Sequence, residues 1–150
     1  MSSREPGPPF IDDHRVSVDA DPLTSWRAVV AVAAGTMSGA AAERYARLIR
    51  CDPARREGDP TATGSSLVGF RVAESVPGER YRLVGRHHFS DYVLDFDVGP
   101  DGAGSIVRAR TYAAFPGALG RIYRTLVIGT RMHVVVTARM LRAVRARAER

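Results

Sequence analysis

Two of the four histidines lie where an imidazole could do chemistry inside the fold. Side chains alternate along a strand and recur every three to four residues along a helix, so His87 and His133 both fall on apolar faces. A buried histidine needs a hydrogen-bond partner. Imidazole also titrates near neutral pH, which suits general acid–base work. Three interpretations stay open: a core histidine satisfied by the protein, a pair that orients the carbonyl or hydroxyl of a ligand, and an acid–base pair.

The other potentially reactive residues give weaker indications of a function. No nucleophile accompanies the histidines, and the single cysteine, Cys51, has no activating neighbour. We expect His88 to point to solvent, and His14 in the first strand has no evident partner. The spacing of the histidines does not match the close ligands of a zinc site, and the chain carries no phosphate-binding glycine loop. The sequence therefore predicts neither a metal nor a cofactor.

One long amphipathic helix, from Phe115 to Arg150, would position His133. At 100° per residue the apolar side chains gather on the side of the histidine, and arginines lie opposite. The apolar stripe comprises Leu119, Ile122, Leu126, Thr137, Met140, Val144 and Ala148, with Tyr123 and Leu141 at its edge. The arginine side comprises Arg121, Arg124, Arg131, Arg139, Arg142 and Arg145. Gly129 indicates a kink or a tight contact, since glycine costs about 1 kcal/mol against alanine in a helix interior.

The strands that would face this helix follow from a two-residue period. Short connections rich in Pro, Gly, Asp and Ser predict an antiparallel meander after a first strand. The predicted strands are Ile11–Asp19, Leu67–Val76, Arg80–Phe89, Asp91–Val98 and Ser105–Phe115.

The alternation also assigns the two faces of this sheet. Asp95 and Asp97 fall on one face of their strand, and Arg108 and Arg110 on one face of the next, which makes them cross-strand partners on a wet face. Asp12 and Asp13 could be called paired carboxylates, as could Asp95 and Asp97. We interpret the first pair as a strand start and the second as members of wet-face salt bridges. Several residues on the other face are small, so they either let the helix approach closely or leave a space. They are Gly85, Ala109, Thr111 and Ala113.

Two short helices and a loop separate the first strand from the meander. Asp21 can cap a helix that has Pro22 at its first position, and this helix should break between residues 33 and 39. A second helix is expected over Ala40–Ile49, with Tyr45, Leu48 and Ile49 inward. The segment Cys51–Ser66 is a long loop that is either functional or mobile, unless it holds a short additional strand.

The length, composition and charge of the chain limit the class of protein to which it can belong. At 150 residues, with 45% hydrophobic and 25% charged residues, we expect a disordered lead-in over 1–11 and a single domain over 12–150. All 22 basic residues are arginines, spread along the chain, so the net charge of +6 indicates a solvated surface rather than a nucleic-acid partner. No membrane span or secretory signal is expected, which favours the cytoplasm. The arginine and alanine bias is typical of a GC-rich, actinobacterial genome.

The chain resembles the START-like helix-grip superfamily, also called SRPBCC, which includes the polyketide cyclases/dehydrases. The resemblance extends over about residues 12–148 and is strongest with uncharacterised bacterial members. Its motifs concern the scaffold: Asp19–Pro22 leading to Trp26, Gly69–Val72, Gly85–Ser90, Phe115–Gly117 and Ile128–His133. It implies an α+β fold in which a curved antiparallel sheet wraps around a long C-terminal helix. The family usually has six or seven strands, whereas the pattern here predicts five.

The resemblance implies an internal cavity between sheet and helix that holds a small hydrophobic or amphipathic molecule, such as a lipid. A cyclase/dehydrase-like enzyme on the same fold and a protein-interaction domain with a filled core are the alternatives. Ile128 and Val135 on the arginine side of the helix favour a homodimer contact. The candidate cavity residues are His87, Phe89, Tyr92, Leu94, Phe96, Ala109, Thr111, Ala113, Tyr123, Leu126, Thr130, His133 and Thr137.

Overall fold

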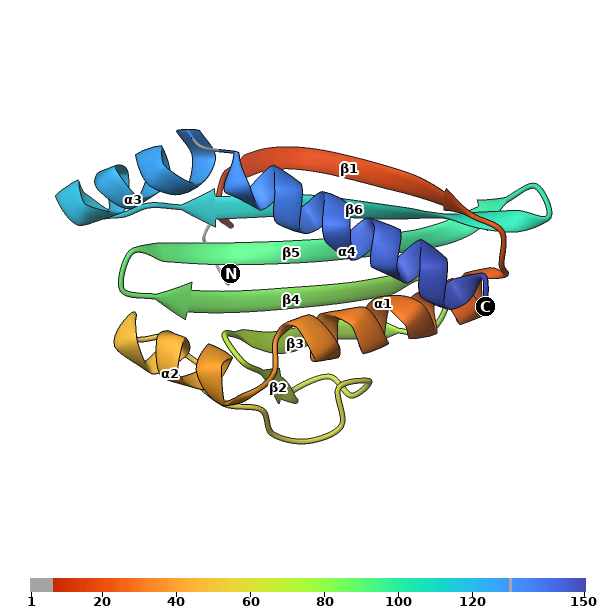
Figure 1. The fold of residues 1–150 in the computed structure, drawn as a ribbon, viewed down its shortest axis with the longest axis horizontal. Helices are drawn as coiled ribbons and strands as arrows, with labels where there is room; N and C mark the ends of the chain where they lie inside the picture. Colours follow the sequence, from red (N-terminus) through yellow and green to blue (C-terminus); the bar gives the residue numbers. More distant parts are fainter. Residues whose placement is uncertain (1–6, 130) are drawn as a thin grey trace, which may run out of the picture.

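One antiparallel sheet carries two helices across one of its faces (Figure 1). The computed structural model describes residues 7–129 and 131–150, and its described side chains exclude those of residues 127–129 and 132. In chain order the elements are β1 (Phe10–Val18), α1 (Pro22–Thr36), α2 (Ala40–Leu48), β2 (Ser66–Leu67), β3 (Phe70–Val76), β4 (Arg80–His87), β5 (Ser90–Asp101), β6 (Gly104–Ala114), α3 (Gly117–Gly129) and α4 (Met132–Ala148).

The sheet confirms the predicted meander and adds two pairings. Its strand order is β1-β6-β5-β4-β3-β2, so the first strand pairs with the last. β1 spans Phe10–Val18, one residue earlier at each end than the strand that we predicted over Ile11–Asp19. The long loop after α2 ends in the short strand β2, and Glu57 within this loop bridges to Ser66. The described part of the sheet therefore has six strands rather than five.

Helix α1 begins where its sequence signals place it. The Asp21 carboxylate accepts hydrogen bonds from the backbone N–H of Thr24 at 3.0 Å and from its hydroxyl at 2.6 Å, and Pro22 opens the helix. The buried Trp26 donates its indole N–H to the carbonyl oxygen of Arg80 at 2.9 Å. The helix continues to Thr36, past the break that we predicted from residue 33, because Ala33 and Ala34 are buried in the core.

The core lies on the face of the sheet that α1 and α4 cover, which we call the concave face. It is concentrated toward the end where α1 and the second half of α4 cross the strands. We call this region the closed end and define it by Tyr81, Phe96, Val98, Val107 and Ala109. Packed on these strand residues are the helix side chains Trp26, Val29, Val30, Ala33, Met140, Leu141, Val144 and Ala148.

The C-terminal helix is two helices rather than the single one that we predicted. Arg131 adopts a left-handed conformation, with φ of 55°, between α3 and α4. The interruption sets α3 at the end of the sheet near the β4–β5 turn, while α4 crosses the concave face (Figure 1). The second half of the predicted stripe is buried, from Thr137 to Ala148. The first half is not, because α3 has no sheet beneath it: Leu119, Ile122 and Leu126 are 57–60% exposed.

Helix α2 also departs from its expected packing. Tyr45 is 56% exposed and Leu48 is 79% exposed, whereas the small Ala46 is the buried residue. The predicted inward orientation of Tyr45 and Leu48 is therefore wrong. A nine-residue helix at the margin of the sheet has too little underlying surface to cover large side chains on one face.

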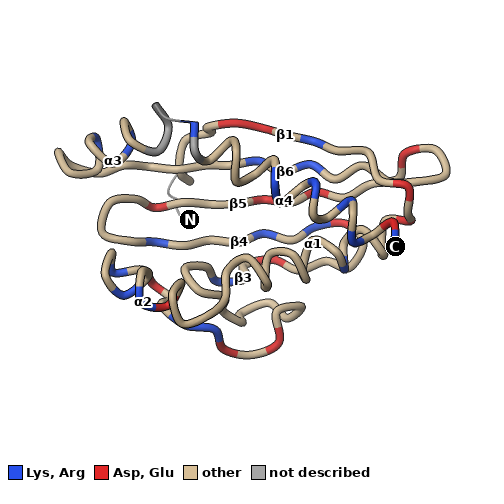
Figure 2. The backbone as a smooth tube through the Cα atoms, in the orientation of Figure 1, with Lys and Arg blue, Asp and Glu red and all other residues tan. Residues whose placement is uncertain are grey.

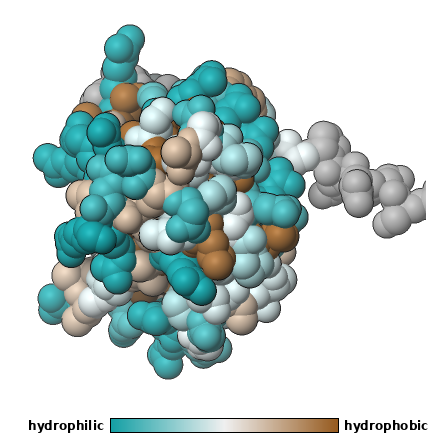
Figure 3. Space-filling view, turned by 90° about the vertical axis from the view of Figure 1, so that its right-hand side faces the viewer, coloured by the Kyte–Doolittle hydropathy of each residue, from teal (hydrophilic) through white to brown (hydrophobic). Residues whose placement is uncertain are grey.

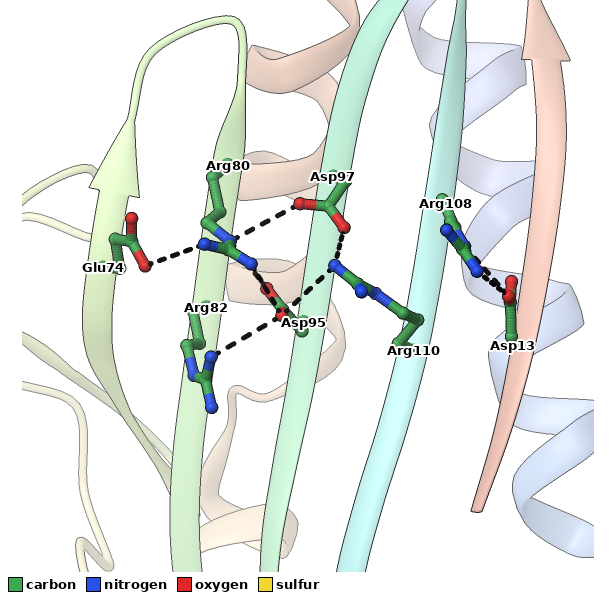
Figure 4. Close-up of polar contacts among 8 residues, drawn as sticks. All are labelled: Asp13, Glu74, Arg80, Arg82, Asp95, Asp97, Arg108 and Arg110. Atoms are coloured by element: carbon green, nitrogen blue, oxygen red, sulfur yellow. Dashed lines mark hydrogen bonds and ion pairs between the residues drawn. The ribbon is translucent and has the colours of Figure 1, made fainter. Parts of the chain in front are cut away.

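The opposite face, which we call the convex face, carries ion pairs between strands (Figure 4). The register aligns Asp95 with Arg110 and Asp97 with Arg108, as the alternation predicted. The side chains of Arg110 and Asp97 are paired, and Arg110 also reaches Asp95. Arg108 turns the other way and binds Asp13 on β1, which the local pattern alone does not specify. Asp95 is only 1% exposed, and its carboxylate is compensated by the guanidinium groups of Arg80, Arg82 and Arg110. This charged face is the one that turns away from the helices.

The remaining charges are dispersed. Figure 2 shows arginines on helices and strands alike, with acidic residues between them. Within the described part of the chain, no helix is long and apolar enough to cross a membrane.

Candidate functional site

The structure distributes the predicted cavity residues over three regions of the concave face. Leu94, Phe96 and Ala109 are buried in the core. A second group, at the end of the sheet beside α3, contains His87, Phe89, Tyr92, Ala113 and Tyr123. Thr111, His133 and the buried Thr137 lie where α4 begins to cross the sheet. Leu126 is exposed on α3, and Thr130 lies outside the described residues.

The second group forms an aromatic cluster around His87. The imidazole centroid lies 4.9 Å from the Tyr123 ring, 5.3 Å from the Tyr92 ring and 5.9 Å from the Phe89 ring. Phe89 and Tyr123 stack with an interplanar angle of 12°. A Cβ at Gly120 would lie 2.7 Å from the carbonyl carbon of Phe115 and 3.2 Å from the carbonyl oxygen of Phe89, so glycine lets α3 approach the backbone at this end of the sheet. We call this region, with Gly85, Tyr92 and Ala113 on the strands, the open end.

His87 is a neutral acceptor in this cluster. Its Nδ1 atom accepts a hydrogen bond from the backbone N–H of Phe89 at 3.0 Å, which places the ring proton on Nε2. Burial lowers the pKa of His87, because an imidazolium ion is poorly solvated among aromatic rings. At neutral pH the ring can donate one hydrogen bond through Nε2.

Tyr92 fills the space above the small residue Gly85. Its hydroxyl donates to the carbonyl oxygen of Gly69 at 2.7 Å, and its ring covers β4. A Cβ at Gly85 would lie 2.3 Å from that ring and 2.2 Å from the Gly69 oxygen. Burial raises the pKa of Tyr92 and raises the pKa of Tyr123 to about 12, so both hydroxyls remain protonated. Here glycine serves close packing rather than an empty cavity.

A cluster of ionisable groups lies beside His133, at the β1 edge of the sheet. The Nε2 atom of His133 is 2.7 Å from Oδ2 of Asp12, and Nε2 of His14 is 3.2 Å from the same oxygen. Asp12 therefore faces helix α4. His14, which had no evident partner in the sequence, has Asp12. The first interpretation of His133, as a histidine satisfied by the protein, agrees with this contact.

The two clusters hold His87 and His133 apart, which disfavours the interpretation in which both orient one ligand. His87 contacts aromatic rings from β5 and α3, whereas His133 pairs with a carboxylate from β1. The register places Asp12 beside Thr111 of β6, and Ala113 two residues further along β6 beside Tyr92. The clusters thus occupy successive rows of the same concave face.

Solved structures show which architecture surrounds these clusters. Ara h 8.0201 superposes with a TM-score of 0.58, at 10% identity, over 95% of this chain and 98% of its own. The KanY protein gives 0.57 at 15% identity, over 97% of this chain and 100% of its own. The Aha1 dimer from Colwellia psychrerythraea gives 0.55 at 13% identity, over 91% of this chain and 94% of its own. The protein has the helix-grip fold.

The helix-grip likeness concerns the fold alone at these identities. No family model and no curated protein matches the sequence. The chemistry must therefore be argued from the residues of this helix-grip domain.

The strand alternation contained the signal for the cluster that sequence reasoning missed. Val18 and Val16 face the core or its margin, and stepping back by two residues along the same strand gives His14 and then Asp12. A bulge at residue 11 lies just beyond, so Phe10 pairs with Tyr112 of the convex face instead. The alternation of the two valines therefore extends to His14 and Asp12.

Two surface hollows lie away from this helix-grip interior. One, of about 490 Å³, is lined by the loop from Asp52 to Glu57 together with Ser66 and Arg71. The other, of about 320 Å³, lies among Asp19, Ser105, Arg145 and Glu149. Neither is lined by a predicted cavity residue. Among the described residues, no group of three or more acidic, histidine or cysteine side chains could hold a metal ion.

Proposed function

We propose that this protein binds a small hydrophobic or amphipathic molecule at the open end of the concave face. The observation that carries the proposal is the exposed apolar stripe of α3, which lies beside the aromatic cluster. Leu119, Ile122 and Leu126 are 57–60% exposed, although their spacing is that of a buried helix face. Fully burying such a side chain stabilises by about 1.5–3 kcal/mol, so this face favours a partner that covers it.

Helix α2 also carries exposed apolar side chains at the open end. Of the nine large apolar side chains that are exposed in the described chain, five lie on α2 and α3. These two helices flank the β4–β5 turn in Figure 1, and the neighbouring Tyr45 phenol contributes to the raised pKa of Tyr123. By contrast, Figure 3 shows that the opposite end of the molecule has small apolar areas separated by hydrophilic residues. The exposed apolar residues thus gather at the end that the core leaves open.

The polar atoms at this end suit an amphipathic ligand. Aromatic rings supply most of the contact area, while Nε2 of His87 offers one donor inside it. Such a combination, apolar walls with few polar groups, is typical of small-molecule sites.

Titration with 8-anilinonaphthalene-1-sulfonate, an aromatic amphipathic probe, tests this proposal. We expect saturable binding that Tyr123→Ala weakens by at least fivefold. Tyr112→Ala is the matched control, because Tyr112 is a half-buried tyrosine on the convex face against Phe10, and it should leave the affinity unchanged. Equal loss in both variants, or no saturable binding, would contradict a site at the open end.

A homodimer is the second candidate, since the same exposed stripe of α3 could be covered by another copy. Val135 is 50% exposed on α4, and the side chain of Ile128 lies outside the described residues. One structural neighbour is itself described as a dimer. Light scattering after size exclusion separates the candidates: a dimer that Ile122→Asp converts to a monomer, with no probe binding in either form, favours association over ligand binding.

A further inference from the structure

We propose that the open end of the molecule docks on an anionic lipid surface through α2 and α3. The inference goes beyond the proposed ligand binding, because it concerns the outer faces of these two helices and not the aromatic cluster. A lipid surface would bring an apolar ligand to the cluster, but either activity can be tested without the other.

The apolar side of α3 extends past the aromatic cluster. Gly120 and Tyr123 face the sheet, since Gly120 is buried and Tyr123 stacks on Phe89. Ile122 lies about 100° round the helix from Tyr123, on the side away from Gly120. A small molecule among the aromatic rings would therefore leave Ile122, which is 60% exposed, in solvent. A larger apolar partner is needed to cover this side of α3.

Helix α2 adds exposed apolar side chains at the same end. Leu48 is the most exposed large apolar side chain of the described chain, at 79%, and Tyr45, three residues earlier, is 56% exposed. The Tyr45 phenol neighbours that of Tyr123, so α2 and α3 approach each other beside the aromatic cluster. An exposed tyrosine suits a lipid interface, because its ring can meet acyl chains while its hydroxyl meets headgroups.

The charges of the two helices match an anionic partner. Together α2 and α3 contain four arginines and one acidic residue, Glu43, whose carboxylate lies 3.6 Å from the guanidinium group of Arg47. Arg121 and Arg124 are exposed on the side of α3 opposite the apolar stripe, and no carboxylate of the described chain pairs with them. Arginines opposite an apolar side are the pattern of a helix that lies in the interface of a membrane.

A lipid surface accounts for both sides of α3, whereas a second copy of the chain accounts for one. With the apolar stripes of two copies in contact, Arg121 and Arg124 would point away from the interface. In a membrane the helix lies at the depth of the headgroups, so long arginine side chains can reach phosphate groups while the apolar stripe enters the acyl chains. The charges therefore favour an anionic lipid surface.

Co-sedimentation with vesicles of phosphatidylcholine and phosphatidylglycerol, in a ratio of about 7:3, tests the inference. The wild type should bind these vesicles at least about tenfold more tightly than vesicles of phosphatidylcholine alone, and high salt should weaken the binding. Ile122→Asp should weaken the binding by at least about tenfold, because a carboxylate does not enter the acyl chains. Arg121→Gln together with Arg124→Gln should also weaken it, by about fivefold for each arginine.

Two control variants make the same chemical changes away from the open end. Arg139→Gln together with Arg142→Gln removes two exposed arginines at the same spacing from α4. Leu23→Asp places a carboxylate at the start of α1, where the leucine is 39% exposed. Both controls should keep vesicle binding within about twofold of the wild type, because charges far from the lipid are screened. Far-UV circular dichroism verifies that every variant is folded.

The outcomes separate docking from ligand binding. Absence of binding to the anionic vesicles, binding that survives Ile122→Asp, or equal losses in the control and α3 variants would overturn docking through the open end. If such a protein still binds 8-anilinonaphthalene-1-sulfonate without vesicles, the ligand-binding proposal stands alone. Vesicle binding without saturable probe binding supports docking and removes the small-molecule site. A dimer that Ile122→Asp dissociates, with no vesicle binding, overturns docking and assigns the stripe to a second copy.

Discussion

The two ends of the concave face are built from the same strands but differ in how helices cover them. At the closed end, Phe96, Val107 and Val144 are almost fully buried between the sheet, α1 and α4. At the open end the strands carry an aromatic cluster, and the adjoining α3 keeps its apolar side chains in solvent. One end is organised as a core, and the other has the composition of a core without the element that would cover it. Stability and ligand binding should therefore depend on different residues.

Truncation of a phenylalanine at each end should give the largest contrast. Phe96→Ala removes a ring that is 1% exposed, and we expect the free energy of unfolding to fall by about 3–5 kcal/mol. Phe89→Ala removes a partly exposed ring that stacks on Tyr123, with an expected loss of about 1 kcal/mol. Urea unfolding followed by far-UV circular dichroism measures both. Similar losses would mean that the open end is as firmly packed as the closed end.

Two glycines on neighbouring strands test how closely Tyr92 packs against β4 at the open end. Gly85→Ala forces a Cβ against the ring of Tyr92 and the backbone of Gly69, and should cost about 1–3 kcal/mol of unfolding free energy. Gly99→Ala meets no atom within 4 Å and should change stability by less than about 0.5 kcal/mol. If both variants unfold at the same urea concentration as the wild type, Tyr92 does not pack over Gly85.

The smallest expected effect is a pH dependence from His87. Burial holds its pKa below the usual value of 6.5, so the unfolded chain takes up this proton at a higher pH than the folded chain does. The stabilisation from neutral His87 is complete above about pH 6.5 and declines as the pH falls toward the lower folded pKa. His87→Phe should flatten the dependence of unfolding free energy on pH in this window, whereas His88→Gln on the exposed side should leave it unchanged. A slope that persists in His87→Phe would assign the effect to other groups.

Local patterns predicted the parts of the fold that depend on neighbours in the chain. The alternation placed Asp95 and Asp97 against Arg108 and Arg110, and Asp21 with Pro22 marked the start of α1. Gly129 indicated a kink or a tight contact near the break between α3 and α4, but one glycine costs too little to decide whether a helix continues. The outcome depends on whether a sheet lies beneath α3.

The arrangement of the candidate residues was predicted in part for a similar reason. The inward orientation of His87, Tyr92 and Tyr123 followed from periodicity, and these residues do meet. The partner of His133 did not follow, since Asp12 lies 121 positions away and is brought close only by the pairing of β1 with β6. Extending the alternation of β1 backward would have identified Asp12 and His14 as inward residues, but not their contact with α4.

The most direct measurement is a two-dimensional ¹⁵N NMR titration with 8-anilinonaphthalene-1-sulfonate. The single tryptophan, Trp26, reports on the closed end through its indole N–H, and the amides of Gly85 and Gly120 report on the open end. We expect saturable chemical-shift changes in the amide signals of Gly85 and Gly120, while the indole signal of Trp26 does not move. Shifts at Trp26 that equal those of the two glycines, or shifts at Trp26 alone, would contradict the assignment of ligand binding to the open end.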